Sequence, residues 1–264
     1  MKTTLLLIAT VLLIGRAVPA QDLQYRMVMS TLVPQMPDMP APSMMVYQKG
    51  TKIRVEAQIP LGKADPPSLP DYMQTSTIVD QQAGKIFLLD AETKEFDERP
   101  FTMPEFDTAQ ARQLAELPGK FRETGDTLTI QGYRAKRFVL SMEMPFNPVP
   151  SGKKDGRFVM IMETWGTSDT TLTEAYRIFQ ALQELQSPGS SSRLSDLQRV
   201  GFPVRNTVLM VNVPATGSYD VESLLKAGAN APGLQMRMST EIRDIKTVRL
   251  DPALFEVPKD YRRR

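Results

Sequence analysis

Methionine is the residue type with the clearest potential for binding chemistry here, with 16 copies in 264 residues. Thioether side chains are flexible and polarisable, so they adapt to irregular apolar shapes. Several methionines occur in pairs separated by one residue: Met27 and Met29, Met142 and Met144, Met160 and Met162, and Met236 and Met238. Within a β-strand, residues two apart point to the same face. The pairs therefore predict strands whose methionines line a shared interior.

This interior is the first candidate binding site. Its expected lining is Met142, Met144, Phe158, Met160, Met162, Phe179, Met236 and Met238. The ligand would be a lipid or another apolar small molecule. In the alternative interpretation the same methionines only fill gaps in a solid core, and the protein is a structural or interaction module.

A second methionine group lies in and just after a proline-rich stretch, "VPQMPDMPAPS". Its members are Met36, Met39, Met44 and Met45. Thioethers are soft ligands that select Cu(I), so a copper-binding protein is a further alternative to a plain surface loop. No other metal and no cofactor are expected.

Enzymatic chemistry finds little support in the composition. The chain has no histidine and no cysteine, which excludes His-assisted serine or cysteine hydrolysis and ordinary zinc sites. Ser151 to Lys154 match the bare S-x-x-K pattern, but the companion motifs of acyl-transfer enzymes are missing. A single tryptophan, Trp165, offers little surface for stacking on sugars. The sequence favours a non-enzymatic binding protein.

Residues 1–20 have the pattern of a cleaved secretory signal peptide. Lys2 supplies a positive charge, residues 5–14 are apolar, and Val18 and Ala20 form a small-residue cleavage site. The apolar run is too short to span a bilayer. We therefore expect a soluble periplasmic or secreted protein without a transmembrane segment in the mature chain.

The charge balance bears on partners. Of 32 basic residues, Lys2 and Arg16 lie in the signal segment, so 30 basic residues balance 30 acidic ones in the mature chain. Such a chain has no broad positive field, which argues against nucleic-acid binding. A protein of the bacterial cell envelope is a further expected partner. The length of residues 21–264 suffices for one large core without disulfides, and we expect a single domain.

Periodicity predicts mainly antiparallel strands. In "TKIRVEAQI", Ile53, Val55 and Ala57 point to one face and charged residues to the other. Helices are expected near 108–117, at 170–186 and in "YDVESLLKAG", with Ser168, Asp169 or Thr170 capping the second. This second helix carries Phe179 on its apolar stripe and is expected to lie across the inner face of the sheet. A slip in alternation at Arg243 predicts a bulge, and Asp251 with Pro252 predicts a capped turn. The expected class is α+β.

Several segments in order resemble a known family. They are "YQKGTKIRVE", "IVDQQAGKIFLLDAETKEF", "TGDTLTIQGYRAKRF", "METWGTSD", "TEIRDIKTVRLD" and "FEVPKDY". Together they resemble an uncharacterised exported bacterial domain of unknown function, related to the periplasmic lipoprotein-carrier (LolA/LolB-like) superfamily. The resemblance implies an incomplete, curved antiparallel β-barrel wrapped around two or three helices. It also implies an apolar interior, which in the carriers receives acyl chains, and a single half-barrel over residues 21–264.

Overall fold

The computed structural model describes most of the chain. The described residues are 22–34, 41–60, 72–101, 119–144, 156–170, 172–173, 200–214, 216 and 218–264. The strands are β1 (Leu23–Leu32), β2 (Ser43–Lys49), β3 (Lys52–Pro60), β4 (Tyr72–Asp80), β5 (Lys85–Asp90), β6 (Glu95–Pro100), β7 (Gly119–Ile130), β8 (Tyr133–Met144), β9 (Gly156–Thr167), β10 (Phe202–Pro214), β11 (Leu234–Thr247) and β12 (Arg262–Arg263). The helical elements are α4 (Val221–Ala227) and the 3-10 turns η1 (Gly228–Asn230) and η2 (Pro252–Phe255).

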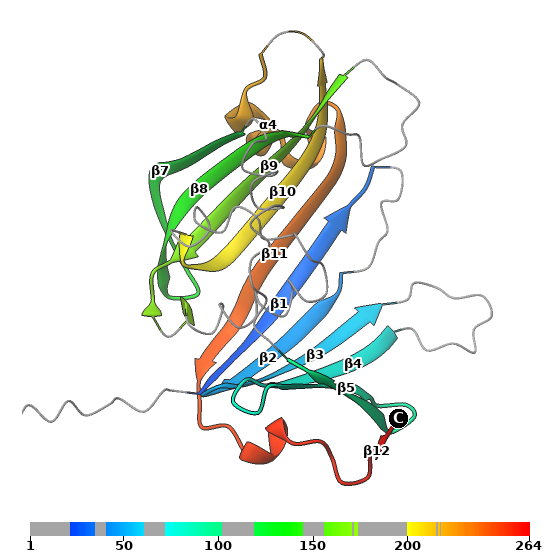
Figure 1. Ribbon diagram of the computed structural model, residues 1–264. Helices are drawn as coiled ribbons and strands as arrows, with labels where there is room; N and C mark the ends of the chain where they lie inside the picture. The colour runs from blue at the N-terminus through cyan, green and yellow to red at the C-terminus, as the bar shows by residue number, and fades with distance from the viewer. Residues whose placement is uncertain are drawn as a thin grey trace, which may run out of the picture.

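All twelve strands belong to one sheet in the order β12-β6-β5-β4-β3-β2-β1-β11-β10-β9-β8-β7. Neighbouring strands are antiparallel, except that β12 runs parallel to β6. Figure 1 shows the strand direction turning steadily from β7 to β5, so the sheet is strongly curved and its two edges do not meet. The predicted incomplete, curved antiparallel barrel is thus confirmed in its strands.

The described residues do not confirm the predicted number of helices. The described residues are mostly strand and contain one short α-helix, α4, so they do not confirm the α+β class or the two or three helices expected. The helix expected at 108–117 and most of the one at 170–186 lie outside the described residues. Within the described stretches, no helix has the length and apolar character needed to cross a membrane.

The helix expected at 170–186 does begin where a cap was predicted. The Asp169 carboxylate accepts a hydrogen bond from the Leu172 backbone N–H at 3.1 Å, and the Thr173 N–H bonds the Asp169 carbonyl at 3.0 Å. Asp169 thus satisfies backbone donors that a helix start leaves without partners. Leu172 is fully buried in the main core cluster, against which Trp165 also packs.

This core cluster covers one face of β1 to β5 and also includes residues of β7, β8, β10 and β11. The alternation read in β3 holds, because Ile53 is fully buried there and Val55 packs against the cluster. β1 lies between β2 and β11, so it joins the first hairpins to the last long strand. The predicted bulge is present: β11 has two residues between Arg243 and Lys246 where β1 has one, and Asp244 adopts a φ of 54°.

The C-terminal segment covers the other face of this part of the sheet. η2 lies against β3 and β4. Arg54 Nη1 donates to the Leu254 carbonyl at 3.0 Å, and Arg54 is aligned with Ile78, on the face opposite Ile53. The predicted capped turn is confirmed, since the Asp251 carboxylate accepts a hydrogen bond from the Ala253 N–H at 3.0 Å.

Asp22 links the start of β1 to this C-terminal segment. Its carboxylate accepts hydrogen bonds from Lys49 Nζ at 2.6 Å and from the Leu250 N–H at 2.8 Å. Burial by itself would raise the pKa of Asp22, but these two donors hold it below its ordinary value. The charged Asp22 carboxylate therefore joins the start of β1 to Leu250, which lies 228 residues later in the chain.

Candidate functional site

Methionines from four adjacent strands meet in one row. Met142 of β8 is directly opposite Met160 of β9, which is opposite Met210 of β10, which is opposite Met236 of β11. Directly opposed residues share a face of the sheet, with Cβ atoms about 4.5–5.5 Å apart. We call the face of β8 to β11 that carries this row the methionine face.

A second apolar row runs beside the first on the same face. Leu140, Met162, Val208 and Met238 occupy matching positions on β8 to β11, and Met238 is also opposite Thr31 of β1. Two residues along a strand span about 6.6–6.8 Å, so the rows are near neighbours. The alternation predicted from the methionine pairs is therefore present, and the strands bring the pairs together.

Exposure changes across the methionine face. Met142 on β8 is 5% exposed, whereas Met238 on β11 is 39% exposed. Met160, Met162, Met210 and Met236 are partly buried. Large apolar side chains that stay partly accessible in a continuous patch are typical of binding surfaces. Val208 on β10 is buried, so the most accessible side of the face is the one formed by β11, at Met238.

The remaining candidate residues are placed as follows. Phe158 is buried on β9, opposite Asn212 of β10 and Met144, the last residue of β8. This position continues the methionine face by a further row. Phe179 lies outside the described residues. The assignment of these residues to a ligand site remains a prediction.

The second methionine group is divided between the faces of β2. Met44 is opposite Met27 and packs against the main core cluster, whereas the next residue, Met45, is opposite Arg26 and Glu56. Consecutive strand residues point to opposite faces, so these two sulfurs cannot bind the same ion. Met36 and Met39 lie outside the described residues. Among described residues, no cluster of three or more acidic side chains could hold a metal.

The opposite face of the same strands is covered by α4, and we call it the helix face. Val139, Ile161 and Leu209 form a buried cluster there with Leu224 of α4. Asp220 caps α4, accepting hydrogen bonds from the Glu222 N–H and the Ser223 hydroxyl. A pocket of about 470 Å³ lies beside α4. Its lining includes Val213, Pro214, Tyr219, Leu224, Ala227 and Pro232.

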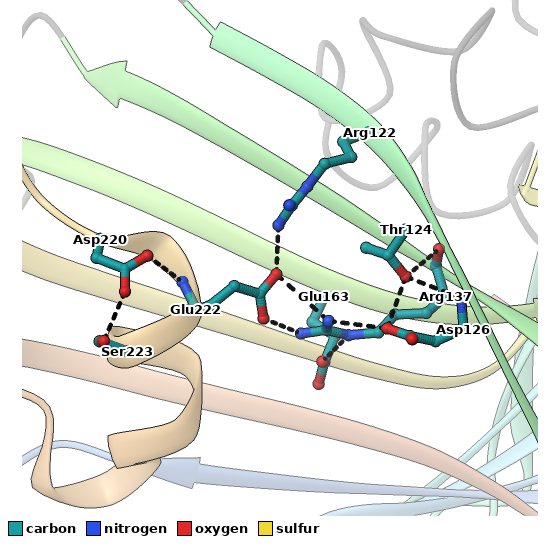
Figure 2. Close-up of polar contacts among 8 residues, drawn as sticks. All are labelled: Arg122, Thr124, Asp126, Arg137, Glu163, Asp220, Glu222 and Ser223. Carbon is teal, nitrogen blue, oxygen red and sulfur yellow. Dashed lines mark hydrogen bonds and ion pairs between the residues drawn. The ribbon is translucent and has the colours of Figure 1, made fainter.

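An ion-pair cluster joins α4 to three strands on the helix face (Figure 2). Arg137 of β8 contacts Glu163 of β9 at 2.6 Å, Glu222 of α4 at 2.8 Å and Asp126 of β7 at 3.3 Å. Arg122 of β7 also pairs with Glu222. Burial alone would lower the pKa of Arg137, but hydrogen bonds to Glu222 and Glu163 raise it above its ordinary value. Arg137 is charged at any physiological pH, and its ion pairs fix α4 on the sheet.

Comparison with known proteins identifies the family of this chain. A family model described as Domain of unknown function (DUF4412) matches residues 26–222, which is most of the chain. The chain belongs to this family. The match confirms the predicted membership of an uncharacterised domain family. No curated protein matches the chain.

Two solved structures show a distant similarity. The Mycobacterium tuberculosis lipoprotein LppX is 9% identical, with 86% of this chain and 89% of that chain covered and a TM-score of 0.32. A putative outer membrane lipoprotein-sorting protein domain from Vibrio parahaemolyticus is 8% identical, with 89% of each chain covered and a TM-score of 0.22. At this level of similarity neither protein's role transfers to this chain.

Sequence reasoning missed part of this family member's candidate site. Met210 completes the first row, and Val208 the second, yet neither belongs to the predicted lining. The alternation in the segment 204–213 was a usable signal for both. No sequence signal identified the cluster around Arg137, because its partners Asp126, Glu163 and Glu222 come from distant segments.

Proposed function

We propose that this protein is a non-enzymatic binding protein for a lipid or another apolar molecule. The observation that carries the proposal is the pair of adjacent apolar rows on the methionine face, of which the β11 side, at Met238, is accessible. A ligand that covers this side removes apolar surface from water, which contributes about 25 cal/mol per Å². Methionine side chains adjust to ligands of different shape, so the expected specificity is for an apolar class.

The main alternative is a structural or interaction module whose barrel is filled. Burial of Met142, Phe158 and Leu140 on the β8 and β9 side fits a filled core as well as the wall of a site. Exposure of Met238 favours binding because it continues a row of apolar side chains on the same face, and an accessible apolar patch is typical of a binding surface. The Cu(I) alternative has less support, because Met44 and Met45 lie on opposite faces of β2.

Changing Met238 to lysine tests the methionine face. A lysine ammonium beside the ligand would have to leave water without an opposite charge, so affinity for a pyrene-labelled alkyl probe should fall at least about tenfold. The matched control is Leu128→Lys on β7, since Leu128 is 42% exposed and Met238 is 39% exposed. Fluorescence titration of both variants measures the effect.

Both variants should keep the parent's far-ultraviolet circular dichroism, because each side chain is already exposed. The expected result is weakened binding for Met238→Lys and unchanged binding for Leu128→Lys. Equal affinities in the two variants would place the probe elsewhere, for instance in the pocket beside α4. No saturable binding by the parent protein would support the filled module.

We also infer that the protein is exported and that residues 21–264 form one half-barrel domain. The inference is supported by the signal-like segment 1–20 and by a single sheet that includes strands from both ends of residues 22–264. When the full gene is expressed in a bacterium, the mature protein should appear in the periplasm or medium. N-terminal sequencing should begin at Gln21 or within two residues of it. A cytoplasmic product that retains Met1 would contradict export.

A further inference from the structure

A polar row adjoins the two apolar rows on the methionine face. Asn206 of β10 is directly opposite Thr164 of β9 and Thr240 of β11. These residues lie two positions along their strands from Met162, Val208 and Met238, so they share the same face. The separation from the methionines is about 7 Å, which is within reach of one bound amphiphile.

One hydrogen bond fixes how the Asn206 amide is presented. The Thr164 hydroxyl, which is buried, donates to Asn206 Oδ1 at 2.9 Å. With its oxygen held in this way, the amide keeps Nδ2 as a free donor. Among the residues that the structure describes, none forms a hydrogen bond with Asn206 Nδ2 or with the Thr240 hydroxyl. A ligand oxygen placed between Asn206 Nδ2 and the Thr240 hydroxyl would accept hydrogen bonds from both.

Among the described residues, the charged pair at the end of this row is neutralised. At its β7 end, beyond Phe138, Glu123 accepts a hydrogen bond from Lys136 Nζ at 2.8 Å. The polar positions of this row, Thr164, Asn206 and Thr240, carry no charge. A carboxylate or phosphate bound here would lose hydration without gaining a cation, which is costly. The row therefore suits an uncharged acceptor.

We propose that Asn206 and Thr240 form a subsite for an uncharged carbonyl, such as that of an ester, whose alkyl chain lies along the methionine rows. This assignment rests on the proposed function and names its ligand class: a neutral acyl ester lipid. Thr164 acts as a positioning residue, because it touches Asn206 Oδ1 and not the ligand. Met162, Val208 and Met238 contact the part of the chain next to the carbonyl.

The experiment compares two pyrene-labelled probes of equal chain length, an alkane and an alkyl methyl ester. The parent protein should bind the ester about 25-fold more tightly, which corresponds to two hydrogen bonds of about 1 kcal/mol each. Asn206→Leu, which is close in volume, should lower this preference about fivefold, because the Thr240 hydroxyl remains as a donor, and should leave alkane affinity unchanged. Thr164→Val should reduce the ester preference in part, because the amide loses its fixed orientation.

Thr207→Val is the matched control, since Thr207 is the next residue of β10 and its hydroxyl contacts Ser239 Oγ at 3.3 Å on the helix face. It should change affinity for neither probe. Equal binding of the two probes by the parent, or an ester preference that is unchanged in Asn206→Leu, would overturn the subsite and leave the proposed function standing. Tighter binding of the free carboxylic acid than of the ester would overturn the uncharged ligand class. Failure to bind either probe would overturn the proposed function and the subsite with it.

Discussion

Arg137→Met should lower the free energy of unfolding by about 3 kcal/mol, because it leaves the largely buried Glu163 carboxylate without its cation. Glu222, by contrast, keeps its pair with Arg122. The Arg137 side chain is 13% exposed and contacts Glu163, Glu222 and Asp126. Glu163 is the most buried of these three acids, so it contributes most of the loss. Methionine keeps most of the aliphatic volume, which limits the packing change.

Urea unfolding followed by far-ultraviolet circular dichroism measures this loss. Trp165 is opposite Arg137 in the β8 and β9 register, so its fluorescence reports local changes as a second signal. The control is Arg99→Met, whose pair with Asp97 is exposed and should contribute less than about 1 kcal/mol. The double variant Arg137→Met with Glu163→Gln should recover part of the loss. A loss below about 1 kcal/mol for Arg137→Met would show that the cluster does not stabilise α4 on the sheet.

The second large effect is expected for Phe202→Ala, at about 3–5 kcal/mol of unfolding free energy. Phe202 is fully buried at the start of β10, and its ring meets that of Tyr25 edge to face, with centroids 5.5 Å apart. The contact joins β10 to β1 within the main core cluster. Truncation removes a large apolar side chain and leaves a cavity that the neighbouring strands cannot fill.

A double-mutant cycle separates the ring contact from simple burial. Phe202→Leu, Tyr25→Leu and the double variant should give a coupling of about 0.5–1.5 kcal/mol. Leu128→Ala is the exposed control, with an expected change within about 0.5 kcal/mol. If Phe202→Ala cost no more than Leu128→Ala, the burial of Phe202 and its place in the core would be contradicted.

Features with a local physical cause were predictable from the sequence. The spacing of the methionine pairs placed their members on common faces because side-chain direction alternates along any strand. The capped turn at Asp251 and the slip at Arg243 were visible because capping and alternation involve only neighbouring residues. The start of the second helix at Asp169 followed from the same local chemistry.

Three strands escaped prediction: β2, whose residues were interpreted as part of the proline-rich loop, and β6 and β12, which share a related reason. β6, "EFDERP", is mostly charged and lacks apolar alternation, so its strand character comes from pairing with β5 and β12. The Arg262 to Arg264 tail looked like a short basic end, yet β12 pairs with β6, and Arg264 contacts Asp90 and Glu95 at 2.7 Å. A strand at the edge of a sheet is defined by a partner that its own sequence does not contain.

By itself, the sequence determined which residues share a strand face and that apolar faces must be covered, because periodicity and burial act along a short stretch of chain. Only the tertiary structure decided which strands lie side by side and in which register. Met142, Met160, Met210 and Met236 form a row, and Thr164 reaches Asn206 across 42 positions, solely because of those registers. Register depends on the simultaneous burial of many residues that are distant in sequence, and a shift of one residue would turn every side chain of a strand to the other face.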